Sequence, residues 1–335
     1  MSTVLKNINF MSQLFTRKQL VFSVMLCLSM SYTFGQDPTF TQFYANPVYL
    51  NPALAGSTGC GRVTMNYRNE WPQLTGNYVT YSASYDNYVK DINGGLGVIA
   101  SYDQQAEGTI STTMVGGIYS YHVKLNRKTS FMFGARAAYY QKVLDWNKLT
   151  FGDMIDPRRG FIYQTGDIPR GGKRGFFDIS TGAVIFTKRF YAGAAVHHLN
   201  QPDESMILGT SKLPFRATVH AGATVPLGRR GRYSDGTTLK PAIIYQYQNG
   251  FQELNLGAFV NFSNLNLGVW YRNKDAFVFI AGVKTDKFSF GYSYDLTVSK
   301  LGTGMTGGSH EISMQIGIKC KRKSRDFRKI SCPSF

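Results

Sequence analysis

The sequence predicts an all-β fold: a transmembrane antiparallel β-barrel of about 14 strands. Three observations lead to this fold class. From Gly61 to Cys320, apolar or aromatic residues alternate with small or polar ones, in stretches that are separated by Asn-, Asp- and Gly-containing turns. This period of two is typical of β-strands. After the N-terminal region no apolar run reaches the roughly 20 residues that a spanning helix needs, and the connections alternate between short and long.

The stretch 287–299 shows the alternation most clearly. Apolar and aromatic side chains occupy one face: Phe288, Phe290, Tyr292, Tyr294, Leu296 and Val298. Small and polar residues occupy the other: Ser289, Gly291, Ser293, Asp295 and Thr297. A soluble β-sandwich would bury the apolar face in a core, whereas an outer-membrane barrel turns it toward lipid and keeps the polar face for the lumen.

Fourteen strands are predicted, most of them near the ten residues that a tilted strand needs to cross a bilayer. Their ranges are 61–68, 77–89, 93–105, 109–123, 128–143, 176–187, 189–198, 215–226, 239–248, 251–262, 264–272, 276–285, 287–298 and 309–319.

The lengths of the connections distinguish the barrel from the sandwich. The three longest connections are Leu144–Gly175, Leu199–Pro214 and Ser299–Ser309, and all three have odd numbers in chain order. The even-numbered connections are mostly short, with Gly228–Thr238 as an exception. Short periplasmic turns and long outer loops are typical of bacterial barrels, and a sandwich does not predict this asymmetry. We therefore favour the barrel.

Two strands break the alternation. Phe259 interrupts the polar face of the strand that contains Glu253 and Asn255, and Ala276–Ile280 is apolar on both faces. A strand that is apolar on both faces, such as Ala276–Ile280, indicates cover from inside by a plug or from outside by a partner.

The chain divides into four predicted parts. Residues 1–35 are expected to be a signal peptide, because Arg17 and Lys18 precede the apolar run Leu20–Met30 and small residues allow cleavage before Gln36. Residues 36–60 form an N-terminal segment, 61–320 the barrel, and 321–335 a basic periplasmic tail. Export to the outer membrane follows from this organisation.

The N-terminal segment 36–60 is not strand-like. Pro38, Pro47 and Pro52 lack backbone donors and exclude a regular ladder. The segment is also rich in aromatic residues, which disordered segments usually lack. Three alternatives remain at this point: a plug in the lumen, a contact with another protein, and a disordered leader.

Three cysteines remain after export: Cys60, Cys320 and Cys332. Cys60 begins the first strand and Cys320 ends the last, so in a closed barrel both lie at the periplasmic end of the seam. A Cys60–Cys320 disulfide is expected there, because the periplasm is oxidising. Pairing of Cys60 with Cys332, pairing of Cys320 with Cys332, and no bridge at all remain open.

The chain is strongly basic, with 37 Lys and Arg against 20 Asp and Glu and a formal net charge of +17. The cations are spread over turns and gather only in the tail Lys321–Lys329, so no helical basic stripe points to nucleic acid. Anionic lipid or an acidic protein is the more plausible partner. Lys321, Arg322 and Lys323 are accordingly candidate partner-binding residues.

No catalytic or cofactor-binding residue is predicted. The sequence holds no G-x-S-x-G or H-E-x-x-H motif and no phosphate-binding glycine loop. His197 and His198 are adjacent in a predicted strand, so they are expected on opposite faces, where they could not share a metal. No metal site is therefore expected.

The N-terminal segment resembles that of a known family. Asp37-Pro38, Phe40-Thr41-Gln42-Phe43-Tyr44, Asn46-Pro47 and Asn51-Pro52-Ala53-Leu54-Ala55-Gly56 are similar to the signature of the PorP/SprF family. Arg68-Asn69-Glu70-Trp71-Pro72 resembles that family's first outer loop, with Glu70 in place of an expected glutamine.

The resemblance implies a non-enzymatic outer-membrane component of the type IX secretion system of Bacteroidota. It also implies partners: periplasmic ring and motor proteins of the secretion and gliding machinery, and adhesin-like cargo with a C-terminal sorting domain. Candidate partner-binding residues in the N-terminal segment are Asp37, Pro38, Phe40, Gln42, Tyr44, Asn46, Asn51, Pro52 and Gly56.

The preferred function is assistance in the secretion or surface anchoring of cargo proteins. The alternative is an outer-membrane channel for small solutes, since a barrel of this size lies between filled eight-stranded barrels and open porins. A hydrolase is the least supported alternative, because the chain lacks a nucleophile–base signature.

Overall fold

The computed structural model describes residues 37–166, 171–206, 209–227, 237–285, 287–299 and 302–318. All elements given below belong to one unit, which begins at Pro38. Among these residues no helix has both the length and the apolar character needed to cross a membrane.

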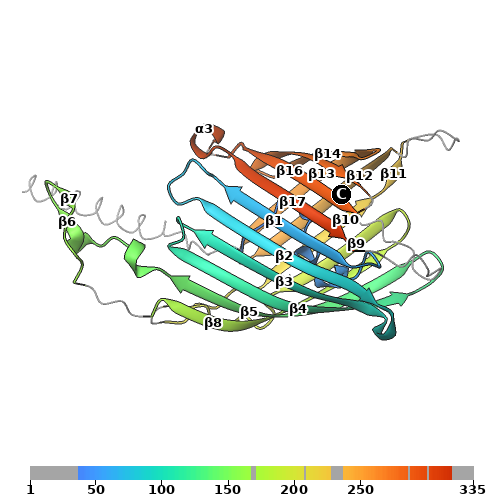
Figure 1. The fold of residues 1–335 in the computed structure, drawn as a ribbon, viewed down its shortest axis with the longest axis horizontal. Helices are drawn as coiled ribbons and strands as arrows, with labels where there is room; N and C mark the ends of the chain where they lie inside the picture. The colour runs from blue at the N-terminus through green and yellow to red at the C-terminus, as the bar shows by residue number, and fades with distance from the viewer. Residues whose placement is uncertain are drawn as a thin grey trace, which may run out of the picture. The chain divides into compact units, whose positions relative to one another are not determined.

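In the described part of the chain, fourteen long antiparallel strands form a closed barrel (Figure 1). The strands are β1 (Arg62–Glu70), β2 (Tyr78–Val89), β3 (Gly94–Gln105), β4 (Ile110–Lys124), β5 (Ser130–Leu144), β8 (Lys173–Phe186), β9 (Phe190–His197), β10 (Arg216–Ala223), β12 (Thr238–Gln248), β13 (Phe251–Phe262), β14 (Leu265–Arg272), β15 (Ala276–Lys284), β16 (Phe288–Thr297) and β17 (Ser309–Gly317). The predicted fold class and its fourteen strands are confirmed.

The barrel closes where the first and last strands pair. The register of β1 and β17 runs from Arg62 opposite Gly317 to Glu70 opposite Ser309, and the Ile318 amide donates to the Gly61 carbonyl at 2.8 Å. Every other long strand pairs with its neighbours in chain order. The sheet has no open edge, so the barrel satisfies its backbone polar groups as a membrane requires.

The apolar faces of the strands point outward. On β16, Phe288, Phe290 and Tyr292 are exposed while Ser289 and Ser293 are buried, as the alternation predicts. Each of the fourteen long strands exposes at least one large apolar side chain. On β9 this is Phe190, and the outward positions that follow are the small residues Ala192 and Ala194. An exposed apolar wall around a polar, buried interior is the pattern of a barrel in lipid.

The two ends of the barrel differ in their connections. At the long-loop end, β5 and β8 are joined through η3 (Trp146–Lys148), η4 (Gly152–Met154) and the hairpin β6 (Ile155–Asp156) and β7 (Gly160–Phe161), which lies beyond the barrel strands in Figure 1. β9–β10 and β16–β17 are the other long connections, the latter with α3 (Thr303–Thr306). The predicted long loops are therefore confirmed.

The opposite end, the short-turn end, carries the connections β2–β3, β4–β5, β8–β9, β13–β14 and β15–β16. The first of these contains η2 (Lys90–Ile92), and β11 (Val225–Pro226) extends the sheet beside β12. By the asymmetry of loop lengths we expect this end to face the periplasm.

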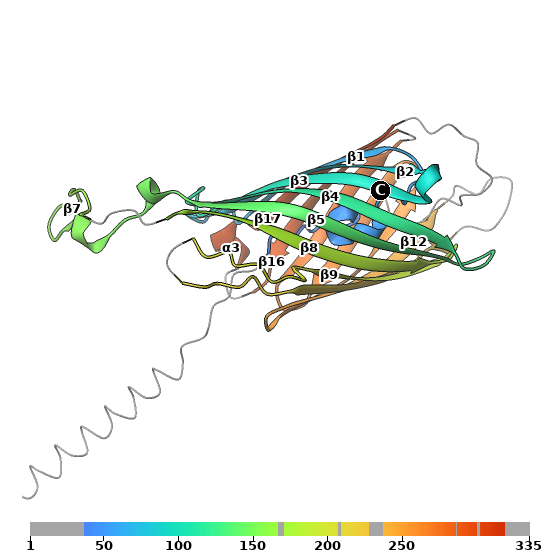
Figure 2. The same cartoon turned by 90° about the horizontal axis from the view of Figure 1, so that it is seen from below.

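The segment before β1 lies inside the barrel, between its walls (Figure 2). It contains α2 (Pro47–Leu50) and η1 (Pro52–Leu54), and Pro stands at the first helical position of each, where its missing N–H costs no hydrogen bond. We call residues 38–56 the N-terminal plug. Most of its side chains are buried, which favours the first of the three alternatives for this segment.

Candidate functional site

The N-terminal plug crosses the lumen from one end of the barrel to the other. Thr41 contacts Arg68, Asp295 and Glu311, each of which lies two residues from the long-loop end of its strand. Gly56 instead contacts Asp86, near the short-turn end of β2. The plug therefore begins near the long-loop end of the lumen and ends near the short-turn end.

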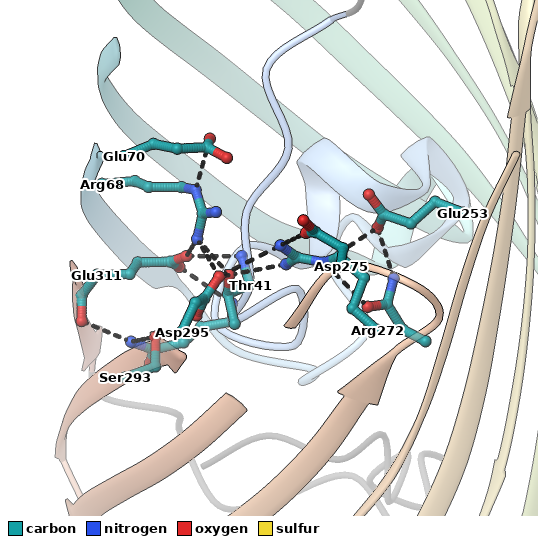
Figure 3. A network of polar contacts seen from close by, with 11 residues as sticks. Thr41, Arg68, Glu70, Glu253, Arg272, Asp275, Ser293, Asp295 and Glu311 are labelled. Carbon is teal, nitrogen blue, oxygen red and sulfur yellow. Dashed lines mark hydrogen bonds and ion pairs between the residues drawn. The ribbon is translucent and has the colours of Figure 1, made fainter. Parts of the chain in front are cut away.

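Thr41 lies at the centre of a network of buried charges (Figure 3). Its hydroxyl donates to Asp295 Oδ2 at 2.7 Å and accepts from Arg68 Nη1 and, at 3.0 Å, from Arg272 Nη2. Its amide donates to Glu311 Oε2 at 2.6 Å. One small side chain thus joins three strands, because a hydroxyl can donate and accept at once.

The two arginines of this network are both compensated by carboxylates. Asp295 Oδ2 lies 3.1 Å from Arg68 Nη1 and 3.3 Å from Arg272 Nη1, so that one carboxylate serves both guanidinium groups. Arg68 also pairs with Glu70 and Glu311. Arg272 also pairs with Glu253 and Asp275. Buried charges are tolerated only when they are paired in this way.

Gln42 is held by both its backbone and its side chain. Its amide donates to Glu311 Oε1 at 3.1 Å, its Nε2 donates to Ser293 Oγ at 3.2 Å, and its Oε1 accepts from Ser313 Oγ at 2.6 Å. Further along, Gln315 Nε2 donates to the carbonyl of Tyr44 at 3.2 Å. The polar faces of β16 and β17 thus substitute for the hydrogen bonds that an irregular backbone lacks.

The neighbouring strands β12 to β15 hold the plug by apolar contact. Phe43 and Tyr44 pack against Trp270 and Phe259, with the Phe43 and Trp270 ring centroids 4.9 Å apart at 85° and those of Tyr44 and Phe259 4.6 Å apart at 90°. Ile244, Val278 and Ile280 complete this buried cluster. Both breaks in the alternation are thereby explained, because Phe259 and the inner face of β15 cover the plug.

Two asparagines fix the middle of the plug. Asn51 donates through Nδ2 to the carbonyls of Ala183 at 3.2 Å and Ala194 at 3.1 Å, while its Oδ1 accepts from the Ala53 amide at 2.9 Å. Asn46 donates to Ser82 Oγ at 3.0 Å. Asn51 therefore caps η1 and reaches two barrel strands with the same side chain.

At the short-turn end an ion pair holds the plug's last turn. Arg62 binds Asp86 through two N–H groups, at 2.9 and 3.0 Å, and donates to the Leu54 carbonyl at 3.3 Å. Asp86 accepts from the Gly56 amide at 2.8 Å. Gly95 is required beside this turn, since a Cβ there would collide with the carbonyl of Ala55.

A second group of buried polar residues lies on β5, β8 and the end of β9. Arg136 Nη2 donates to Ser180 Oγ at 3.0 Å and lies 3.7 Å from Asp178 Oδ2. His198 Nδ1 lies 2.9 Å from Asp178 Oδ1, and His197 Nδ1 lies 3.4 Å from Arg136. The cluster stands beside the plug, since His197 Nε2 lies 3.4 Å from the Leu50 carbonyl.

The expectation that His197 and His198 lie on opposite faces is wrong. β9 ends at His197, and His198 has a left-handed backbone with φ of 58°, which turns its side chain to the same, buried side. Their ring centroids lie 6.5 Å apart. Among the described residues, however, no group of three or more His, Cys, Asp or Glu could hold a metal ion.

The predicted partner-binding residues of the N-terminal segment gather in the lumen. All but Asp37 and Pro38 are buried against the chain's own walls: Phe40, Gln42, Tyr44, Asn46, Asn51, Pro52 and Gly56. Pro38 accepts from the Tyr49 hydroxyl at 2.6 Å. Contact of these residues with another protein stays a prediction.

The remaining predicted site residues lie at the other end of the chain. Lys321, Arg322 and Lys323 fall outside the described residues, as does Cys320. Cys60 is disulfide-bonded, and its pairing with Cys320 stays a prediction. The register of the seam is compatible with that pairing, since Gly61 bonds to Ile318.

The residues that hold the plug are not singled out by the alternation of the sequence. Arg68, Arg272, Asp295 and Glu311 stand on the polar faces of their strands, where an ionisable side chain needs a partner inside the lumen. An ionisable residue at a lumen-facing position of a strand therefore indicates a contact inside the lumen. Arg136 on β5 and Asp178 on β8 are further residues of this kind.

Three solved barrels illustrate what the chain resembles in structure. The toluene transporter TbuX of Ralstonia pickettii is 10% identical, over 81% of this chain and 93% of that one, with a TM-score of 0.47. A FadL homologue of Pseudomonas aeruginosa is 12% identical, over 81% and 94%, with a TM-score of 0.44. The Acinetobacter baumannii outer membrane protein Omp33 is 8% identical, over 78% and 100%, with a TM-score of 0.41.

The family comparison is more specific. No curated protein is similar enough to the chain to count as a match. A family model does match, that of the type IX secretion system membrane protein PorP/SprF, over residues 32–316. The matched range includes the whole N-terminal plug and nearly all of the barrel. The chain therefore belongs to the PorP/SprF family of type IX secretion system membrane proteins.

Proposed function

We propose that this protein is a non-enzymatic outer-membrane component of the type IX secretion and gliding machinery, and that it acts by binding. It would assist the secretion or the surface anchoring of cargo proteins, such as adhesins with a C-terminal sorting domain. In this proposal an N-terminal signal peptide exports the chain to the outer membrane of a Gram-negative cell, and ring and motor proteins contact it from the periplasm.

The occupied lumen is the observation that carries this proposal. The plug is fixed by buried ion pairs at both ends and by an aromatic cluster between them. A lumen filled by the chain's own residues supports a rigid binding scaffold better than it supports a channel for small solutes. Binding would then fall to the two ends of the barrel.

The long-loop end offers a surface suited to cargo. The arm between β5 and β8 exposes large apolar side chains: Ile155, Phe161, Ile162 and Tyr163. The arm is nevertheless ordered, because Asp156 accepts from the amides of Arg158 and Arg159 at 2.8 Å each. Exposed apolar groups on an ordered loop are typical of a protein-binding surface.

A pull-down from outer membrane solubilised in mild detergent tests the proposal. The bait would be the full-length tagged protein, and the variant would replace Gly152–Gly166 with a short Gly/Ser linker. Shortening the β9–β10 loop by a similar length gives a matched control. Heat-modifiable mobility on SDS gels would verify that each barrel is folded.

We expect wild type and the control to recover type IX ring proteins and a sorting-domain adhesin, and the arm variant to lose the adhesin only. Recovery of the barrel alone in all three samples would contradict the proposal. In that case single-channel conductance of the wild-type protein becomes decisive, because steady open currents would favour the solute channel.

A further inference from the structure

The two ends of the barrel differ in charge as well as in loop length. Within the described residues, the short-turn end carries nine cations besides Arg62: Lys90, Lys124, Arg127, Lys128, Lys188, Arg189, Lys240, Lys284 and Lys287. The described carboxylates at this end are Asp91 and Asp86, and Asp86 is bound to Arg62. At the long-loop end cations and carboxylates are interspersed, as in the pair Arg174–Asp203.

Two of these cations, Lys124 and Lys284, occupy lumen-facing positions. On β4, His122 contacts the plug at the carbonyl of Ala55, and Lys124 is the next residue on the same face. On β15, Lys284 follows Val278 and Ile280, which pack against the plug. Residues two apart on a strand share a face, so these cations line the mouth of the lumen.

The lipid-facing positions beside the cations are apolar. Tyr119 and Tyr121 on β4, Phe190 on β9 and Val283 on β15 are all exposed on the outer face. Cations that bind lipid headgroups are expected on that outer face, level with the aromatic belt. The lumen-side positions of Lys124 and Lys284 favour a partner that approaches the mouth itself.

The charge is also poorly compensated within the chain. Lys124, Lys128 and Lys188 are exposed, and none of them takes part in an ion pair with the described residues. Three unpaired cations on neighbouring turns repel one another, and a bound acidic group would remove that cost. The β4–β5 and β8–β9 turns that hold them are close, because β5 pairs with β8.

We propose that this basic mouth, formed by Lys90, Lys124, Lys128, Lys188 and Arg189 around the short-turn opening of the lumen, is a docking site for an acidic segment of a protein. The inference rests on the proposed function, in which a periplasmic partner contacts this end, and it names the chemistry of that partner. Charge complementarity at such a site raises the association rate and makes binding depend on salt.

The test measures binding of a fluorescein-labelled oligoglutamate peptide to the full-length protein in phosphatidylcholine nanodiscs, by fluorescence anisotropy. The variant is Lys124→Gln/Lys128→Gln/Lys188→Gln. The matched control is Arg158→Gln/Arg159→Gln/Lys212→Gln, which removes three exposed cations from the long-loop end. Short-chain phosphatidylglycerol serves as a competitor that reports lipid headgroups.

We expect the mouth variant to bind the peptide about tenfold more weakly than wild type, while the control binds like wild type. Salt near 1 M, where the Debye length is about 3 Å, should abolish the difference. Equal losses in both variants, or no loss in either, would overturn the proposal. Displacement of the peptide by phosphatidylglycerol, but not by phosphatidylcholine, would assign the mouth to lipid headgroups and would also overturn it.

This experiment needs no component of the secretion machinery. A failed pull-down with intact peptide binding would count against the proposed function and leave the acidic-docking site standing. A successful pull-down with charge-independent peptide binding would do the reverse.

Discussion

The plug is held by two walls of the lumen, one through ion pairs and hydrogen bonds and the other through aromatic contacts. The charged wall, formed by β1, β14, β16 and β17, binds Thr41 and Gln42 through Arg68, Arg272, Asp295 and Glu311. The aromatic wall, formed by β12 to β15, binds the next two residues, Phe43 and Tyr44, by ring contact. Four consecutive residues thus meet two different environments, which adjoin at β14, because that strand carries both Arg272 and Trp270.

The difference teaches which wall sets position and which supplies affinity. Hydrogen bonds and ion pairs have fixed directions, and charges in a buried network tolerate no change of partner. Ring contacts contribute through buried area and tolerate small shifts. We infer that the charged wall determines the register of the plug, while the aromatic wall supplies much of the free energy that keeps it inside.

The largest expected effect comes from Asp295→Ala. The substitution leaves Arg68 and Arg272 with less compensation in a buried site, so the free energy of unfolding should fall by about 4 kcal/mol. Urea unfolding of the refolded protein in detergent, followed by tryptophan fluorescence, measures this loss. Wild-type stability in this variant would show that the charged wall is not needed.

The matched control for this change is Asp295→Asn, which keeps the size and an acceptor oxygen but removes the charge. A double variant, Asp295→Asn/Arg272→Gln, removes both members of one buried ion pair. It should lose less stability than the two single substitutions lose together, because the Asp295–Arg272 interaction is lost only once.

A smaller effect is expected from Phe43→Ala on the aromatic wall. Loss of the ring opens a cavity beside Trp270 and should lower the free energy of unfolding by about 3 kcal/mol. The charged network should stay intact, so Thr41 keeps its register. Single-channel recording separates the walls: Asp295→Ala should give frequent openings, and Phe43→Ala should give few. The reverse order would refute the division of roles.

The smallest of the three effects is expected from Cys60→Ser, outside both walls. If Cys60 pairs with Cys320, the bond closes a seam whose strands are already in register, so its loss should cost only about 2 kcal/mol, at the low end for disulfides. Peptide mapping under non-reducing conditions identifies the partner. A Cys60–Cys332 peptide would contradict the predicted pairing, and Cys332→Ser serves as the control.

The fold followed from the sequence because each strand carries its own signal. The alternation at 287–299 and the apolar inner face at Ala276–Ile280 are local patterns, and both have the structural meaning that they predict. Contacts across the lumen depend instead on how the barrel closes. Nothing near Thr41 in the sequence indicates that it meets Asp295, which is 254 residues away.

The prediction that His197 and His198 lie on opposite faces was wrong for a related reason. The alternation rule holds only within a strand, and the end of β9 at His197 is set by the turn that follows. His198 adopts a positive φ that the rule does not anticipate. Arg136 and Asp178 were visible as lumen-facing charges, but their pairing with those histidines required the three-dimensional register.

The position of the plug constrains the order in which the molecule can assemble. Residues 38–56 precede every strand, yet they contact the wall as far along the chain as Gln315, and the Thr41–Glu311 contact spans 270 residues. The first strand, β1, also pairs with the last, β17, and cannot complete its pairing until β17 has formed. We infer that the plug is in place before β1 meets β17, so that closure of the barrel around it is a late step of high contact order. Such a step is slow, and until it is complete the partly formed sheet keeps two open edges for an assembly factor to hold.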